Sequence, residues 1–191
     1  MFMRYRLLCA SGLLALGTLT LSAGGDDTHP TLVGPYYPTA SWAQTLPCRT
    51  LANCPRFIVL ANFGNAAVLD RETGLVWERS PSVEPSSWHL AHVRCNEFVT
   101  LGSRLGWRLP TVNELASLVD PSRSDPALPA GHPFTNVQLS EHYWSATTDS
   151  RILDNKWVVG FFDDGDVGNA RNKDDARFVW CVRGGQGTDP Q

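Results

Sequence analysis

Cysteine usage limits what this chain can fold into more than any other feature of its sequence. The chain has five cysteines, of which Cys9 lies inside an apolar N-terminal stretch that has the composition of an export signal. Cys48, Cys54, Cys95 and Cys181 lie beyond that stretch. An even number of cysteines behind an export signal predicts two disulfides formed in an oxidising compartment, with the pairing left open. A zinc site is the alternative, although no two cysteines have the C-x-x-C spacing typical of such sites.

The export signal is predicted over residues 1–23. Arg4 and Arg6 form a short positive segment, an apolar stretch follows, and small residues around Ala23 suit a signal peptidase. The apolar stretch is too short and too rich in glycine and threonine to favour a membrane span. We therefore expect a secreted or periplasmic protein with no membrane span after cleavage, and an uncleaved N-terminal anchor is the alternative.

One folded domain is expected after the signal, because the remaining length suits a single core. Residues 24–56 are interrupted by prolines and are predicted to be an N-terminal extension, residues 57–185 the domain, and residues 186–191 a flexible tail. The formal net charge is −3 at pH 7. The chain thus lacks the basic excess that drives general binding to nucleic acid or to membranes.

The apolar pattern predicts an α+β fold, in which a hairpin precedes two helices and a run of antiparallel strands. Gly74 can adopt the positive φ that the hairpin turn needs. Phe134 is expected to pin the long loop at residues 120–142 to the core. The expected strands are residues 57–60, 67–70, 75–78, 143–147, 156–162 and 177–183.

Two helices are expected between the hairpin and the later strands. The first begins at Ser86 or Ser87, and the second begins with a capping box of Thr111 and Glu114 and ends at Pro121. The apolar stripe of the first helix is predicted to consist of Trp88, Ala91, Cys95 and Phe98. Cys95 should therefore face the core, where a disulfide would be protected.

Several sequence blocks resemble the Lcl C-terminal domain family, and the resemblance spans roughly residues 68–184. The blocks are Asp70–Trp77, Gly106–Thr111 with Glu114 and Leu115, Tyr143–Ser145 and Cys181–Gly184. The resemblance implies a disulfide-stabilised C-type-lectin-like fold, with two helices packed on a small twisted antiparallel sheet and with long loops. Proteins of this fold include formylglycine-generating enzymes and bacterial surface adhesins.

The resemblance also implies that Cys95 pairs with Cys181, which leaves Cys48 for Cys54. The namesake adhesin of the family is associated with sulfated glycans and with trimers, but this chain lacks the collagen-like repeats of that protein. The expected partners are a glycan or a protein surface, and a homo-oligomer is a further expectation.

Polar segments near the end of the domain are the predicted ligand-binding region, because exposed loops on a rigid scaffold commonly carry recognition. Their side chains mix donors and acceptors that suit sugar hydroxyls or a polar protein surface, and a solvated loop without a partner is the alternative. The candidate residues are Asp163, Asp164, Asp166, Asn169, Arg171, Asn172, Lys173, Asp174, Asp175 and Arg177. The stretch from Asn169 to Arg177 is expected to be a loop before the last strand.

No cofactor is predicted, although the acidic members of this set could supply oxygens to Ca²⁺. These members are Asp163, Asp164, Asp166, Asp174 and Asp175. The loop motifs of calcium-dependent lectins are absent from the sequence. His89 and His92 stand three apart on the first helix, and we expect them to be solvated or hydrogen-bonded rather than metal ligands.

The tryptophans are expected to pack in the core rather than to stack on sugars. Those concerned are Trp77, Trp107, Trp144, Trp157 and Trp180. Arg108 is expected to bond to the backbone or to a buried acid.

No catalytic motif is present: the sequence has no nucleophile elbow, no His-Glu-x-x-His helix and no phosphate-binding glycine loop. Formylglycine-generating enzymes need reactive cysteines that bind copper, and two disulfides would occupy all four. The sequence therefore predicts an exported, non-catalytic ligand-binding or adhesion module for glycans or for envelope or host surface components. The alternatives are a formylglycine-generating-type enzyme and a self-associating structural protein of the envelope.

Overall fold

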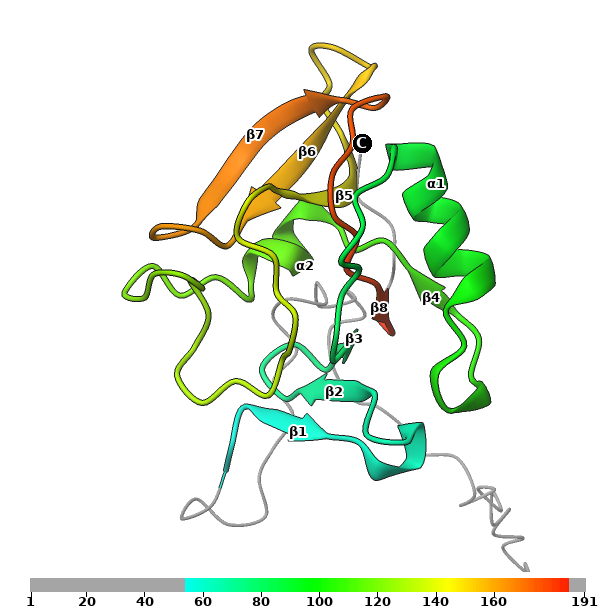
Figure 1. Cartoon of the computed structure of the whole chain (residues 1–191), viewed down its shortest axis with the longest axis vertical. Helices are drawn as coiled ribbons and strands as arrows, with labels where there is room; N and C mark the ends of the chain where they lie inside the picture. Colours follow the sequence, from blue (N-terminus) through cyan, green and yellow to red (C-terminus); the bar gives the residue numbers. More distant parts are fainter. Residues whose placement is uncertain (1–53, 186–191) are drawn as a thin grey trace, which may run out of the picture. The chain divides into compact units, whose positions relative to one another are not determined.

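The computed structural model describes residues 54–185, in which two antiparallel sheets are accompanied by two helices (Figure 1). This arrangement confirms the predicted α+β class. The predicted signal at residues 1–23, most of the N-terminal extension, Cys48 and the tail at residues 186–191 lie outside the described residues. No helix between residues 54 and 185 is long and apolar enough to cross a membrane.

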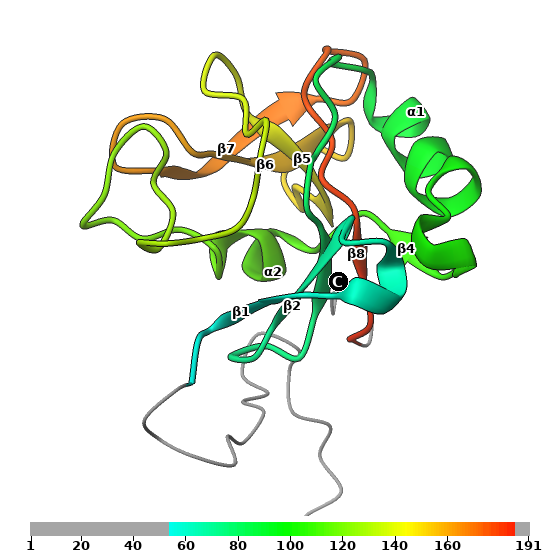
Figure 2. The ribbon, with the colours of Figure 1, turned by 60° about the horizontal axis from the view of Figure 1, so that its bottom comes forward.

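The first sheet has the strand order β1-β2-β3-β8-β4, and all its neighbouring strands are antiparallel. Its strands are β1 (Phe57–Val59), β2 (Ala67–Asp70), β3 (Val76–Glu78), β8 (Val182–Arg183) and β4 (Trp107–Arg108). β2 and β3 form the predicted hairpin, and Gly74 in its turn has a φ of 69°. Figure 2 shows β1 and β2 side by side at the edge of this sheet.

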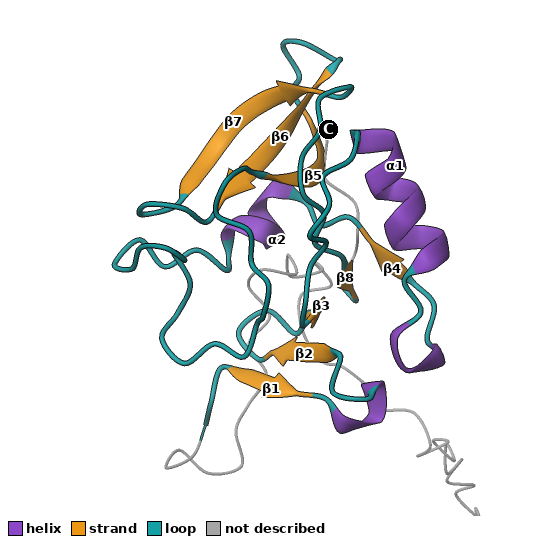
Figure 3. Cartoon of the chain, viewed as in Figure 1, coloured by secondary structure: helices purple, strands orange, loops and turns teal. Residues whose placement is uncertain are grey.

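The second sheet has the order β5-β6-β7. Its strands are β5 (Tyr143–Thr148), β6 (Asn155–Gly160) and β7 (Asp166–Asn172). A long loop without regular structure leads from the second helix to β5 (Figure 3). Phe134 pins this loop as predicted, because its side chain is buried and packs edge-on against Trp180, with ring centroids 4.9 Å apart.

The last predicted strand, residues 177–183, is wrong over most of its length, because only β8 is a strand there. The backbone N–H groups before β8 bond to different partners in turn. That of Phe178 donates to the His142 carbonyl, that of Val179 to the Ser82 hydroxyl, and that of Cys181 to the Glu78 carboxylate. The segment therefore connects the two sheets instead of extending either one.

The first helix, α1 (Trp88–Val93), continues as a π-helical turn over residues 94–98. The predicted stripe holds for Ala91 and Cys95, which are buried, but it is wrong for Phe98, which is 73% exposed. A π-turn holds more residues than an α-turn, so it rotates Phe98 away from the core. Val99, the next residue, is buried instead.

The second helix, α2 (Val112–Ala116), begins with the predicted capping box. The Thr111 hydroxyl accepts from the Glu114 N–H at 3.2 Å, and the Glu114 carboxylate accepts from the Thr111 N–H at 2.9 Å. Two backbone donors at the helix start are thereby satisfied. Leu115 in α2 and Leu118, just after the helix, are buried in the core.

The core consists of two clusters. One packs α2 against β3 and β5 around Trp77, Tyr143 and Trp180. The other lies beneath α1 and contains the disulfide between Cys95 and Cys181, whose Cα atoms are 5.5 Å apart. This bond confirms the pairing that the family resemblance implies. Trp77, Trp107, Trp144 and Trp180 are buried as predicted, and Trp157 is half-buried.

Gly165, in the turn between β6 and β7, gives a stability prediction. Its φ is 88°, and an added Cβ would lie 2.5 Å from Cγ1 of Val119. We expect Gly165→Ala to lower the free energy of unfolding by about 2–4 kcal/mol, because the cost of the strained backbone is added to the cost of overpacking. Gly131 has a φ of 73° with open space around it, so Gly131→Ala should lose only about 1 kcal/mol from strain. Urea unfolding of both variants measures the difference, and equal losses would contradict the packing of Gly165 against Val119.

Candidate functional site

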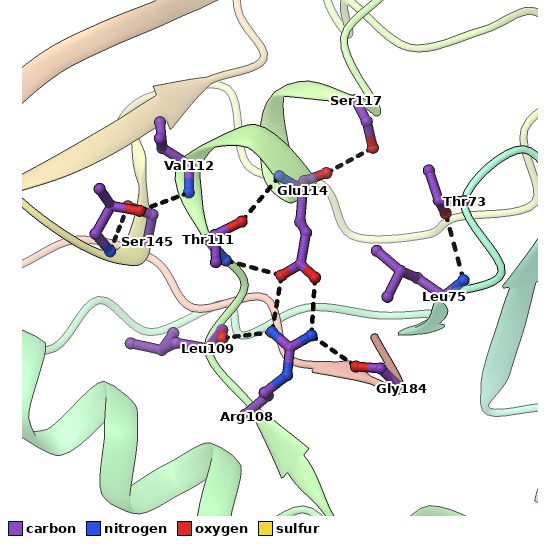
Figure 4. Close-up of polar contacts among 11 residues, drawn as sticks. Thr73, Leu75, Arg108, Leu109, Thr111, Val112, Glu114, Ser117, Ser145 and Gly184 are labelled. Carbon is purple, nitrogen blue, oxygen red and sulfur yellow. Dashed lines mark hydrogen bonds and ion pairs between the residues drawn. The ribbon is translucent and has the colours of Figure 1, made fainter. Parts of the chain in front are cut away.

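Arg108 and Glu114, which belong to the sequence block from Trp107 to Glu114, form an ion pair in which the carboxylate is buried (Figure 4). Both guanidinium Nη atoms of Arg108 lie 2.8 Å from the carboxylate oxygens of Glu114, whose side chain is 1% exposed. Arg108 also donates to the carbonyl oxygens of Leu109 and Gly184. The pair therefore ties β4, α2 and the chain after β8 together, which confirms the structural role predicted for Arg108.

A second ion pair supports the disulfide. Arg94 lies 2.8 and 2.9 Å from the two carboxylate oxygens of Glu78, whose side chain is 4% exposed. Glu78 also accepts the backbone N–H of Cys181 at 2.9 Å. The segment that carries Cys181 is thus held by the disulfide and by a backbone hydrogen bond to a carboxylate that Arg94 positions.

The ten candidate ligand-binding residues do not lie in one loop. Asn169 and Arg171, with Asp166 and Asn172, lie in β7 and pair with β6, so the expected loop before the last strand is wrong over this stretch. The backbone pairing with β6 overrides the low strand propensity of these polar residues. Asp163 and Asp164 lie in the turn before β7, Lys173, Asp174 and Asp175 follow β7, and Arg177 lies further along the chain.

This placement contradicts a calcium site made from the five acidic residues. β7 has seven residues, a length of about 20 Å, so the acids before it and after it lie at opposite ends of the strand. Between residues 54 and 185, no group of three or more histidine, cysteine or acidic side chains is placed to hold a metal ion.

The end of β7 near α1 is structural in character. Lys173 pairs with Asp154, a contact that lowers the pKa of the carboxyl, and both side chains are well exposed. The Lys173 carbonyl accepts the backbone N–H of Trp88 at the start of α1. Exposed pairs of this kind contribute little free energy, so this end mainly orients α1.

Lys156 and His92 pack against Trp88 nearby. The Lys156 ammonium donates to the Thr148 hydroxyl and to the Leu153 carbonyl and lies 4.6 Å from the centre of the Trp88 ring. Burial lowers the pKa of Lys156. Burial also lowers the pKa of His92, with smaller effects from His89 and Lys156. Cys95, three residues after His92, is in the disulfide.

Asp166, at the start of β7, belongs to a row of ionisable side chains that come from separate segments and that reaches Asp175, beyond the other end of the strand. We call Glu141, His142, Asp166, Asp175 and Arg177 the charge cluster. His142 Nε2 lies 2.9 Å from Asp166 Oδ2, and His142 Nδ1 lies 3.8 Å from Glu141 Oε2. Arg177 Nε lies 2.9 Å from Glu141 Oε2, and Arg177 Nη2 lies 3.3 Å from Asp175 Oδ2.

The sheet register brings His142 and Asp166 together. β5 pairs Tyr143 with Val159, and β6 pairs Gly160 with Asp166, so Gly160 lies between the histidine and the aspartate on the sheet. A Cβ at Gly160 would lie 2.6 Å from the Phe162 ring. That ring packs edge-on against His142, with centroids 5.0 Å apart, and covers one side of the imidazole.

Backbone pairing brings Arg177 to the same place. Arg177 exchanges two backbone hydrogen bonds with Ser86, and Phe178 lies beside Tyr143 in a parallel bridge. The residue before β5 and the segment after β7 are therefore neighbours, although they are more than 30 positions apart in the chain.

Burial divides the charge cluster into two kinds of group. The side chains of His142 and Arg177 are 7% and 16% exposed, whereas those of Glu141, Asp166 and Asp175 are 44%, 36% and 44% exposed. His142 is hydrogen-bonded to the partly exposed carboxylate of Asp166 and Arg177 to that of Asp175, whereas Arg177 and Glu141 are joined by an ion pair alone. Such carboxylates can accept hydrogen bonds from hydroxyl groups or from ammonium groups of a ligand.

Sequence reasoning included Asp166, Asp175 and Arg177 but missed Glu141 and His142. These two residues end the long loop and directly precede the Tyr-Trp-Ser strand. One signal could have identified them: an acidic residue and a histidine stand together at the start of a strand, where side chains can reach across neighbouring strands.

A family model for the Lcl C-terminal domain matches residues 66–183. This range contains the disulfide, both buried ion pairs and all five residues of the charge cluster. The search of curated proteins found no match for the chain.

Proposed function

The chain belongs to the Lcl C-terminal domain family, and from this premise we propose that it is an exported, non-catalytic ligand-binding or adhesion module. We assign it a C-type-lectin-like fold. Two short helices, small antiparallel sheets, long loops and a disulfide from the first helix to the last strand segment support this assignment. The ligand is a glycan or a polar component of an envelope or host surface.

The charge cluster is the observation that carries the proposal. Its three carboxylates come from three separate segments, and each is held by a cation or a histidine while keeping a third or more of its side chain exposed. Preorganised acceptors of this kind lose little conformational entropy when they bind hydroxyl or ammonium groups. A merely solvated surface has no need of buried histidine and arginine partners.

Export is supported by the Cys95–Cys181 disulfide, because such bonds form and persist in oxidising compartments. The N-terminal signal predicted from the sequence supports the same location, secreted or periplasmic. Self-association in the envelope is the alternative role for a chain of this kind.

A formylglycine-generating-type activity has less support. Such an enzyme uses free cysteines to bind copper, whereas Cys95 and Cys181 are joined to each other and fully buried. A similar fold alone does not confer the activity.

We expect the charge cluster to determine binding. The full chain would be applied to a glycan array and to envelope extracts, and its strongest ligand titrated against variants. Glu141→Gln and Asp166→Asn should each weaken binding by about tenfold or more, since a hydrogen bond to a charged group contributes about 1.5–3 kcal/mol.

Glu97→Gln is the matched control for Glu141→Gln, because it makes the same chemical change at an exposed residue outside both the charge cluster and the ten candidate residues. It should leave binding unchanged. The proposal fails if Glu97→Gln weakens binding as much as Glu141→Gln, or if the wild-type chain retains neither a glycan nor an envelope component.

A further inference from the structure

A separate pocket of about 400 Å³ lies where the end of β3 meets two neighbouring loops. Its walls include Asn65 before β2, Arg79 and Ser80 after β3, and Thr135 from the long loop. Leu101, in the short 3-10 helix Leu101–Ser103, closes one side. The volume lies in the range of small-molecule sites. None of the residues of the charge cluster lines this pocket.

Arg79 gives the pocket a positive charge. Its Nε donates to the Pro133 carbonyl at 3.1 Å, and its Nη1 donates to the Asn65 carbonyl at 3.4 Å, so the guanidinium is oriented by backbone oxygens. Within residues 54–185, no carboxylate forms an ion pair with Arg79. A guanidinium has five N–H donors, and these two bonds leave donors over for a ligand.

The one acid in the pocket wall does not neutralise Arg79. Glu78 lines the pocket, but both of its carboxylate oxygens lie within 2.9 Å of Arg94, and one also accepts the N–H of Cys181. Its charge is therefore already compensated. The pocket retains the charge of Arg79.

The remaining walls suit a small molecule that has an acidic group and an apolar part. The Ser80 hydroxyl accepts a hydrogen bond from the Asn136 amide at 3.0 Å, so its own proton remains available to donate. Thr135 adds a second hydroxyl, and Leu101 with Ala66 supplies apolar surface.

We propose that this pocket binds the carboxylate of a small organic acid with a short apolar tail. The planar fork of Arg79 matches the two oxygens of a carboxylate, and a single uncompensated charge matches a monoanion. The hydroxyls of Ser80 and Thr135 complete the set of donors, and the tail lies along Leu101. This site is independent of the charge cluster, so either can exist without the other.

Sodium butyrate is the probe, and butyramide is its uncharged analogue of nearly the same shape. Titration of the ¹⁵N-labelled full chain should shift the amide signals of residues 65–66, 79–80 and 135. Butyramide should bind about tenfold or more weakly, because the charge-assisted hydrogen bonds to Arg79 are lost. Equal binding of the two compounds, or tighter binding of butanesulfonate than of butyrate, would overturn the carboxylate assignment.

Arg79→Met should weaken butyrate binding by about tenfold or more. Arg123→Met is the matched control, because Arg123 is an exposed arginine that likewise forms no ion pair between residues 54 and 185. It should leave binding unchanged.

Two further variants test the site if Arg79→Met does not fold. Arg79→Lys keeps the charge but not the fork, and Thr135→Val removes a hydroxyl at an exposed position. Each should weaken butyrate binding by about threefold to tenfold. Unchanged affinity in both would overturn the proposal.

Discussion

Removal of the Cys95–Cys181 disulfide by the double change to alanine is expected to lower the free energy of unfolding by about 4 kcal/mol. The bond joins residues 86 positions apart, so without it the unfolded chain gains much conformational freedom. Both cysteines are fully buried, and their truncation removes packing as well. Urea unfolding, followed by tryptophan fluorescence, measures the loss.

Chemical reduction separates the bond from the packing. Reduced wild-type protein keeps both sulfur atoms in the core, so its stability should lie between those of the oxidised protein and of the double alanine variant. The reduced variant serves as the control for effects of the reductant elsewhere in the chain. A double variant within about 1 kcal/mol of the oxidised wild type would contradict the role of this disulfide, because that difference is small against the loss predicted for a loop of this length.

Arg108→Met is expected to lower the free energy of unfolding by about 3–5 kcal/mol. The carboxylate of Glu114 is 1% exposed, and without the guanidinium it would remain buried without its counter-charge. The variant also loses the hydrogen bond to the Gly184 carbonyl, which holds the chain after β8. Thermal and urea unfolding of the variant measure the effect.

Two controls identify the cause of this loss. Lys173 also forms an ion pair with a carboxylate, that of Asp154, but both side chains are exposed, by 42% and 65%. Lys173→Met should therefore have a much smaller effect, because solvent screens exposed ion pairs. Adding Glu114→Gln to Arg108→Met should recover part of the stability, since the buried charge is then gone. Equal losses for Arg108→Met and Lys173→Met would contradict the dominance of burial.

Local signals in the sequence predicted a helix start, a hairpin turn and several core residues. The capping box at Thr111 and the turn at Gly74 are short-range patterns with a direct physical cause, and both were confirmed. The burial of Trp77 and Trp180 follows from the size of their apolar surface. The pairing of Cys95 with Cys181, by contrast, came only from the family resemblance, because spacing alone left it open.

The errors arose where non-local contacts decide the local structure. The polar residues of β7 form a strand because β6 offers them backbone partners, which composition does not reveal. Phe98 leaves the apolar stripe because α1 changes to a π-turn, and an α-helical period cannot anticipate that change.

The charge cluster was only partly predictable for the same reason. His142 and Asp166 meet because the register of β5, β6 and β7 places both beside Gly160. Arg177 joins them through the pairing of its backbone with Ser86. Each contact depends on strand order and register, which the sequence pattern leaves undetermined.

Amide hydrogen exchange of the full chain, measured with and without the strongest ligand from the glycan array or envelope extract, tests the binding role of the charge cluster most directly. We predict slower exchange in the bound state at residues 141–143, 166–167 and 175–178, with residues 88–93 of α1 unchanged. Protection confined to α1 or to the hairpin of β2 and β3, with none around His142, would contradict the account.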